Sequence, residues 1–288
     1  MSKSALLIGI VYNGTSNQLN GCINDVVAMS ERLKKTFGYS DVTVLTDFTP
    51  IKPTKKNIIN EIQKLIEKSK NNKEIFFHYS GHGTREIDLS GDEKDGRDEA
   101  LVPLDYQISG TLTDDELREL FSKSKCPVKI VLDCCHSGSA IDLIYNAKFS
   151  KGRIHKFQEN KTTSSEQPIL MLSGCLDEEL SWDVYLKDQK KFMGALTSTF
   201  LRETEKYNLT MKTEEITIEQ LLLLIYMSLI EKGYIQRPVI SSNKPLNVGG
   251  IFMSKTNQYI PEKNSTIVTT VATKPPPRKR TGGGCVIQ

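Results

Sequence analysis

The sequence predicts an α/β fold, with helices on both faces of a central, mostly parallel sheet. Short apolar runs alternate along the chain with longer segments whose apolar residues recur every three to four positions. The first pattern indicates buried strands and the second indicates amphipathic helices. Strands that alternate with helices favour parallel pairing, because each helix returns the chain to the same edge of the sheet.

The expected elements follow one another along most of the chain. Thr54, Thr113 and Thr217 stand where helices begin, and a threonine there accepts a hydrogen bond from the first turn. Residues 139–167 are expected to form a long loop, of the kind that is often functional. Residues 254–288 are expected to form a flexible tail after one folded domain, residues 1–253. The predicted strands are Ala5–Val11, Val42–Thr46, Glu74–Tyr79, Val128–Leu132 and Pro168–Leu172, and the predicted helices are residues 22–37, 54–70, 113–123, 194–206 and 216–232.

The composition excludes several classes of protein. With 38% hydrophobic residues among 288, the chain holds enough apolar material for a core. It has no apolar run of about 18 residues, the length that spans a membrane, and its N-terminus lacks the features of a signal peptide. The six cysteines show no disulfide framework, so we expect a reducing, cytoplasmic compartment. A net charge of +3 is too small to indicate nucleic acid binding.

Two turns that contain glycine follow predicted strands and carry reactive side chains. His82 lies between Gly81 and Gly83 after one strand, and Cys135 lies just beyond the strand Val128–Leu132. The carboxyl ends of neighbouring parallel strands meet at one edge of a sheet, so we expect these side chains to lie together. An imidazole beside a thiol assists its deprotonation and later protonates the leaving amine. Backbone N–H groups of Gly83 and Cys135 are the candidates for an oxyanion hole.

Each of these residues, taken singly, has an ordinary alternative. A histidine in a turn is often a surface residue, and a buried cysteine usually behaves as a small hydrophobe. A zinc site is a second alternative, but the ligand spacings typical of zinc are missing, and adjacent cysteines point to opposite faces of an extended chain. The two turns together favour a nucleophilic thiol. The zinc ligands would have been drawn from His78, His82, Cys134, Cys135 and His136.

Eight segments spread over residues 4–253 share a family pattern: ALLIGIVYNGTSNQLNGCINDV, FFHYSGHG, DLSGDEKDGRDEALVPLD, GTLTDDEL, KIVLDCCHSGSAIDL, ILMLSGCLDEE, MGALTSTF and QRPVISS. Through them the chain resembles the metacaspases, which are caspase-related cysteine peptidases. His82 and Cys135 are 53 residues apart, close to the caspase separation of about 50. The resemblance implies a monomer with a caspase-like fold. It divides the domain into a large-subunit-like part (1–147), a basic loop (148–167) and a small-subunit-like part (168–253).

The resemblance also implies roles for single residues. His82 and Cys135 match the catalytic dyad, whereas Cys134 stands where the family often has Ser or Ala. The S1 pocket would carry two acidic residues and select protein or peptide substrates with Arg or Lys at P1. A buried pair of carboxylates suits a guanidinium or an ammonium group. By this resemblance the S1 residues are Asp25, Asp133, Cys22 and Ser80.

A calcium site and self-cleavage are implied by the same resemblance. Calcium binds carboxylates gathered from separate loops. Acidic residues are also common in the first turn of a helix and on solvated faces, which is the alternative for these acids. The basic loop offers sites for self-cleavage promoted by calcium, although a solvated surface loop explains its charge equally well. The calcium ligands would be Asp98, Asp114, Asp115 and Asp142, and the self-cleavage candidates are Lys148, Lys151 and Arg153.

The last residues form a separate motif. Cys285-Val-Ile-Gln matches the C-a-a-X pattern for farnesylation of Cys285, although so short a motif also occurs by chance. One lipid chain anchors weakly, and a basic patch is the usual second signal. We therefore expect prenylation and peripheral association with a cytoplasmic membrane leaflet. The basic residues upstream are Lys274, Arg278, Lys279 and Arg280.

These observations favour a calcium-dependent cysteine endopeptidase tethered to membranes. The alternative is a catalytically weak or inactive caspase-like scaffold at membranes, which the presence of both dyad residues and both S1 acids disfavours. A small prenylated GTPase would match the tail, but the sequence has no G-x-x-x-x-G-K-[ST] loop to bind phosphates. Because the first strand begins at residue 4 or 5, we expect no N-terminal prodomain.

Overall fold

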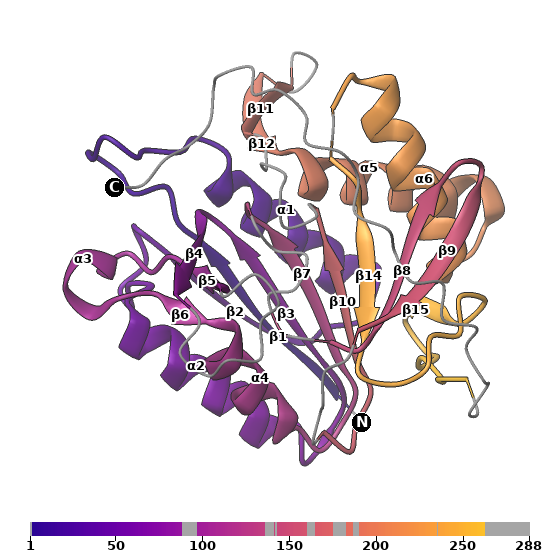
Figure 1. The fold of residues 1–288 in the computed structure, drawn as a ribbon, viewed down its shortest axis with the longest axis horizontal. Helices are drawn as coiled ribbons and strands as arrows, with labels where there is room; N and C mark the ends of the chain where they lie inside the picture. The colour runs from indigo at the N-terminus through magenta and orange to yellow at the C-terminus, as the bar shows by residue number, and fades with distance from the viewer. Residues whose placement is uncertain are drawn as a thin grey trace.

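One large sheet runs through the centre of the molecule (Figure 1). The computed structural model describes residues 2–87, 97–135, 141, 143–159, 165–174, 183–186, 190–234 and 236–262. In these ranges eight strands lie side by side in the order β2 (Asp41–Thr46), β1 (Ser2–Gly9), β3 (Asn72–Ser80), β7 (Val128–Asp133), β10 (Ile169–Ser173), β14 (Val239–Ser242), β8 (Tyr145–Ser150) and β9 (Arg153–Gln158). The first five are parallel neighbours, and the pairs beyond β10 are antiparallel. The predicted mostly parallel sheet is confirmed.

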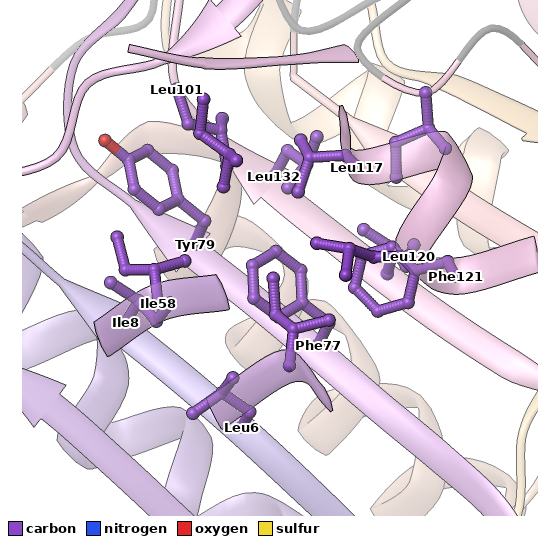
Figure 2. Packing of buried hydrophobic residues seen from close by; sticks show 14 of the residues in the cluster. Leu6, Ile8, Ile58, Phe77, Tyr79, Leu101, Leu117, Leu120, Phe121 and Leu132 are labelled. Carbon is purple, nitrogen blue, oxygen red and sulfur yellow. The ribbon is translucent and has the colours of Figure 1, made fainter. Parts of the chain in front are cut away.

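Helices cover both faces of this sheet, as the sequence predicts. α2 (Lys55–Lys68) and α4 (Asp114–Ser122) pack on one face, and α1 (Cys22–Lys35), α5 (Ala195–Met211) and α6 (Ile218–Glu231) pack on the other. Side chains alternate between the two faces, so Leu6 joins the first core and Leu7 joins the second. Figure 2 shows the first core, where the rings of Phe77 and Phe121 lie 5.2 Å apart. Each such buried side chain contributes about 1.5–3 kcal/mol.

The predicted loop over residues 139–167 is wrong in its central part. Tyr145–Ser150 and Arg153–Gln158 are strands β8 and β9, joined by a turn of two residues. Lys151 and Gly152 both have positive φ, 51° and 77°, which is the backbone of a tight hairpin turn that follows the twist of its strands. Lysine is an uncommon residue at such a position, so the turn carried no recognisable signal in the sequence.

Shorter elements complete the described fold. β4 (Gly83–Ile87), β5 (Arg97–Leu101) and β6 (Leu112–Thr113) form one small sheet, followed closely by α4, and the helix α3 (Tyr106–Ser109) lies between β5 and β6. β11 (Asp183–Leu186) pairs with β12 (Lys191–Gly194), which leads directly into α5, and β13 (Ile216–Thr217) pairs with β15 (Ile251–Met253). Within the described ranges no helix combines the length and the apolar character needed to cross a membrane.

Candidate active site

The parallel pairing of β3 with β7 brings the two predicted catalytic turns together. Ser80 at the end of β3 is opposite Asp133 at the end of β7. His82 and Cys135 each follow two residues later, so they leave the same edge of the sheet from adjacent strands. The N–H of Gly81 donates to the carbonyl of Asp133 at 3.4 Å, which continues the pairing into the turns.

Gly83 marks where these two turns touch. A Cβ atom at Gly83 would lie 2.1 Å from the carbonyl oxygen of Cys135, far closer than any side chain permits. Only glycine allows the two backbones to approach so closely. This contact agrees with the predicted place of Gly83 beside the nucleophile, and the oxyanion-hole role of its N–H stays a prediction.

The imidazole of His82 is held by a backbone carbonyl. Its Nε2 lies 2.7 Å from the carbonyl oxygen of Asn17. Since a carbonyl can only accept, Nε2 carries the hydrogen in this contact, and Nδ1 is then the nitrogen whose lone pair can accept a proton. The ring of Tyr12 packs beside the imidazole, with centroids 4.7 Å apart. The side chain is therefore both oriented and set in one tautomer.

Two buried tyrosines hold the backbone of the histidine turn. The hydroxyl of Tyr12 accepts from the N–H of His82 at 3.0 Å, and the hydroxyl of Tyr79 donates to the carbonyl of His82 at 2.8 Å. Tyr12 also donates to the carbonyl of Val102 at 2.6 Å. Burial raises the pKa of both phenols well above the ordinary value, so both stay neutral hydrogen-bonding groups. Sequence reasoning missed both residues.

Exposure separates the two adjacent cysteines. Cys135 is 8% exposed and Cys134 is 1% exposed, so Cys135 is the thiol that a substrate reaches more easily. Cys126 lies at the other end of β7, where burial raises its pKa to about 12 and leaves it a protonated, unreactive thiol. These differences agree with the choice of Cys135 as the nucleophile.

The two predicted S1 acids converge on Gly194, at the start of α5. A Cβ atom at Gly194 would lie 2.1 Å from Oδ2 of Asp133 and 2.9 Å from Oδ2 of Asp25. The N–H of Gly194 donates to both oxygens of Asp25 at 3.0 Å, and the N–H of Thr197 donates to Asp133 at 2.7 Å. Both carboxylates are buried, and the amino end of a helix favours negative charge.

The other two predicted S1 residues lie beside this pair. Ser80 donates from its hydroxyl to Asp25 at 2.7 Å. Cys22 is buried at the start of α1, three residues before Asp25 and therefore on the same side of the helix. The structure thus gathers the predicted S1 set. Gly194 and Thr197, which hold the two acids, lie in the family segment MGALTSTF but were not predicted as site residues.

The alternative zinc site finds no support in the described residues. The ring of His78 lies in the buried sheet, with Nδ1 3.0 Å from the carbonyl of Val131. Among the residues that the structure describes, no group of three or more His, Cys, Asp or Glu side chains is arranged to hold a metal ion. His136 lies outside the described residues.

Three of the four predicted calcium ligands lie on neighbouring elements. β5 pairs with β6 so that Ala100 is opposite Thr113, the residue before α4; Asp98 lies two residues before Ala100 on β5, and Asp114 and Asp115 begin α4. Asp98 and Asp114 are buried, and Asp115 forms an ion pair with Arg118. Buried carboxylates are the ligand type that calcium prefers. The described side chains fit calcium in their chemistry but do not complete a site, and Asp142 lies outside the described residues.

The three self-cleavage candidates differ in accessibility. Lys148 lies within β8, paired with Val239 on one side and with His155 on the other. Lys151 and Arg153 are exposed at the tip of the hairpin. The hairpin tip is therefore the part of the predicted loop, residues 139–167, that is accessible to another protein. The predicted lipidation site, Cys285, and its basic residues lie outside the described ranges.

Known proteins share both the sequence and the fold of this chain. Residues 3–144 match the family model described as metacaspase, peptidase C14 domain. The chain is 32% identical to Metacaspase-1 of Ajellomyces capsulatus, over 87% of this chain and 82% of that protein. It is 33% identical to Metacaspase-1 of Emericella nidulans, over 87% of this chain and 72% of that protein.

Two solved structures share the fold at lower identity. A crystal structure of a Geobacter sulfurreducens protein gives a TM-score of 0.60 at 22% identity, over 91% of this chain and 100% of that chain. The crystal structure of Caspase-1 from Spodoptera frugiperda gives a TM-score of 0.53 at 16% identity, over 83% of this chain and 85% of that chain. The caspase-like fold, the paired Cys–His turns and the identity to curated relatives agree, and the chain belongs to the metacaspase family of cysteine peptidases.

Proposed function

We propose that this peptidase cleaves proteins after Arg or Lys, and that calcium promotes both its activity and its self-processing. The observation that carries the specificity is the convergence of the Asp25 and Asp133 carboxylates on Gly194. Two buried negative charges so close together repel each other. A guanidinium or ammonium group at P1 would reduce this repulsion, whereas an acidic P1 side chain would add to it.

The proposed reaction uses only groups in the two turns. Nδ1 of His82 takes the proton of the Cys135 thiol, and the thiolate attacks the carbonyl carbon after the P1 residue. The N–H groups of Gly83 and Cys135 stabilise the resulting oxyanion. The imidazolium then gives its proton to the leaving amine, and water hydrolyses the thioester with His82 as the base. Asn17 and the two tyrosines keep the imidazole oriented through these steps.

A panel of peptides tests the specificity. Peptides that differ only at P1, with Arg, Lys or Asp, are incubated with the wild-type chain with and without calcium. We expect cleavage after Arg and Lys only. Asp25→Asn is expected to lower kcat/KM for the Arg peptide by about 10-fold or more, which corresponds to about 1.4 kcal/mol of lost transition-state stabilisation.

Two controls make that panel decisive. Glu67→Gln removes a carboxylate of the same charge from the exposed surface of α2 and should leave the kinetics unchanged. Cys135→Ala should abolish cleavage. Preferred cleavage after Asp would contradict the proposed specificity, and no cleavage of any peptide by the wild-type chain would leave the scaffold as the better description.

The calcium proposal rests on Asp98 and Asp114, two buried carboxylates on adjacent elements. We propose that they bind calcium together with Asp115 and Asp142. The calcium would neutralise their charge and brace the small sheet of β4, β5 and β6. That sheet begins at Gly83, directly after the catalytic histidine, so calcium binding would also stabilise the conformation of the histidine turn.

Self-processing is proposed at the tip of the β8–β9 hairpin. β14 is antiparallel to both β10 and β8, so β8 runs in the same direction as β7. The hairpin tip therefore lies beyond the same ends of the strands as Cys135. It is three strand spacings away, or about 14 Å. Lys151, with a positive φ in the exposed turn, is the preferred site among the three candidates.

We propose further that the chain acts as a monomer, and that its tail attaches it to membranes. The edge strand β9 carries Arg153 and Lys156, and charged side chains on an edge strand oppose pairing between sheets. Light scattering should give the monomer mass of 32.4 kDa.

The membrane proposal depends on Cys285 and the basic residues before it, and fits a cytoplasmic peptidase that meets its substrates at a membrane surface.

A further inference from the structure

A cavity of about 280 Å³ lies between α1, α5 and the β11–β12 hairpin. Two helices present one face each to it, since the lining positions recur every three or four residues. Four of the lining residues are basic, two are acidic and the rest are apolar or hydroxylic. The basic residues are Arg32, Lys35, Lys191 and Arg202, the acidic ones Glu31 and Glu205, and the others Ala28, Thr36, Leu186, Met193, Ser198 and Leu201.

Arg32 is the most unusual of these residues. Its Nε and Nη2 atoms are shielded from solvent and have no hydrogen-bond partner among the described residues. Its guanidinium lies over the ring of Phe37, 5.5 Å from the centroid. Burial lowers the pKa of Arg32, and the nearby charge of Glu205 opposes this only in part. Leaving charged donors without acceptors is costly, so this arrangement calls for an acceptor from outside the chain.

Neither acid of the cavity supplies that acceptor: Glu205 acts on Arg32 through its charge but accepts no hydrogen bond from its Nε or Nη2. Glu31 forms an ion pair with Lys35 at 3.2 Å, and Arg202 forms one with Glu203 at 2.8 Å. Lys191 adds a further positive charge from the hairpin. The cavity is therefore positive on balance, and it has an apolar wall formed by Leu186, Met193, Leu201 and Ala28.

We propose that this cavity binds a small organic anion, whose phosphate or carboxylate group is held by Arg32 and Lys191 and whose apolar body lies on the apolar wall. The volume accommodates more than an inorganic ion and less than a peptide of several residues. A phosphate or carboxylate group has two oxygens that can each accept a charge-assisted hydrogen bond from the planar guanidinium.

The elements that line the cavity also carry Asp25 and the two residues that hold the proposed S1 pair, Gly194 and Thr197. Ala28 and Arg32 follow Asp25 along α1, Met193 precedes Gly194, and Ser198 follows Thr197. The side-chain amide of Asn24 donates to the carbonyl of Phe192 at 2.9 Å and ties α1 to β12 directly. An anion that bridges Arg32 and Lys191 would brace these elements around Asp25. We expect a lower KM for peptides with Arg at P1, an effect that rests on the proposed function, whereas the binding itself does not.

Calorimetric titration of the full-length Cys135→Ala protein tests the site without self-cleavage. The probes are phenyl phosphate, benzoate and phenol, which share an aromatic body and differ in charge. Phenyl phosphate or benzoate should bind, and the stronger of the two identifies the anionic group, while phenol should bind at least 10-fold more weakly. Arg32→Met should weaken the anion at least 10-fold, and Lys191→Met should weaken it as well.

Lys34→Met is the matched control, because Lys34 is exposed on the same helix and does not line the cavity. It should bind the anion as the parent does. Arg32→Met should melt at the parent temperature or higher, since it removes a half-buried charge with unpaired donors and keeps a side chain of similar length. Equal anion binding by Arg32→Met and Lys34→Met would overturn the proposal, as would equal binding of phenol and the anions or no binding at millimolar concentration.

Discussion

His78 is buried in β3, four residues before His82, and burial lowers its pKa to about 4. Nδ1 donates to the carbonyl of Val131 in the neutral form. Because the folded pKa lies below the ordinary value of 6.5, folding favours the neutral imidazole. This stabilisation is complete above pH 6.5 and is lost as the pH falls from 6.5 to about 4.

A stability measurement checks this single residue. In the Cys135→Ala background, the free energy of unfolding should fall by about 3 kcal/mol from this group between pH 7 and pH 4. His78→Gln should remove that part of the slope. His155→Gln, on β9, serves as the control and should keep it. Equal slopes for the His78→Gln protein and the parent would show that His78 is not held neutral in the core.

At the scale of single residues, the sequence predicts the reactive groups better than the groups that hold them. His82 and Cys135 were recognisable because glycine accompanies both turns and strands precede them. Three groups hold His82. The backbone carbonyl of Asn17 binds its ring, and the hydroxyls of Tyr12 and Tyr79 bind its backbone. Asn17 acts through its backbone, which any residue type supplies, and tyrosines are common in cores. No pattern of residue types points to such contacts.

The β8–β9 hairpin provides the prediction at the scale of elements. Addition of calcium to the full-length chain should produce a cut after Lys151, read by N-terminal sequencing of the new fragment from Gly152. Lys151→Gln should suppress that cut, because the exposed turn is the part of the hairpin that can enter an active site.

Asp114→Asn should raise the calcium concentration required by about 10-fold or more, since it removes a buried carboxylate from the proposed site.

Lys148→Gln is the matched control for the hairpin. It removes the same charge within β8, where the backbone is paired on both sides, and should leave the cut unchanged. An uncut chain with full activity would contradict self-processing as a step in activation. An unchanged calcium requirement in Asp114→Asn would contradict the proposed ligand set.

Elements with strong local signals were predictable, and elements made by distant pairing were not. Thr54, Thr113 and Thr217 do cap α2, α4 and α6, each accepting from the backbone three residues later. β14 and the β8–β9 hairpin are strands because they pair with each other and with β10. Short strands of this kind depend on partners far away in the sequence, so periodicity alone does not identify them.

At the scale of the whole molecule, the proposed membrane attachment depends on the tail. Native protein from eukaryotic cells should carry one farnesyl group on Cys285, measured by intact-mass spectrometry, and Cys285→Ser should move it from the membrane fraction to the soluble fraction. Neutralising Arg278, Lys279 and Arg280 should keep the lipid and weaken binding to anionic vesicles, since each basic residue contributes about 1 kcal/mol. An unmodified C-terminus in the native protein would dismiss the tether.

We propose above that the Cys135 thiol, activated by His82 and placed beside the Asp25–Asp133 pair, is the nucleophile for substrates with a basic P1 residue. Labelling by a peptidyl chloromethyl ketone with Arg at P1, mapped by mass spectrometry of the digested protein, tests it directly. Cys135 alone should be alkylated, at least 10-fold more slowly in His82→Ala and in Asp25→Asn. Alkylation of Cys134 or Cys22, or an undiminished rate in both variants, would contradict it.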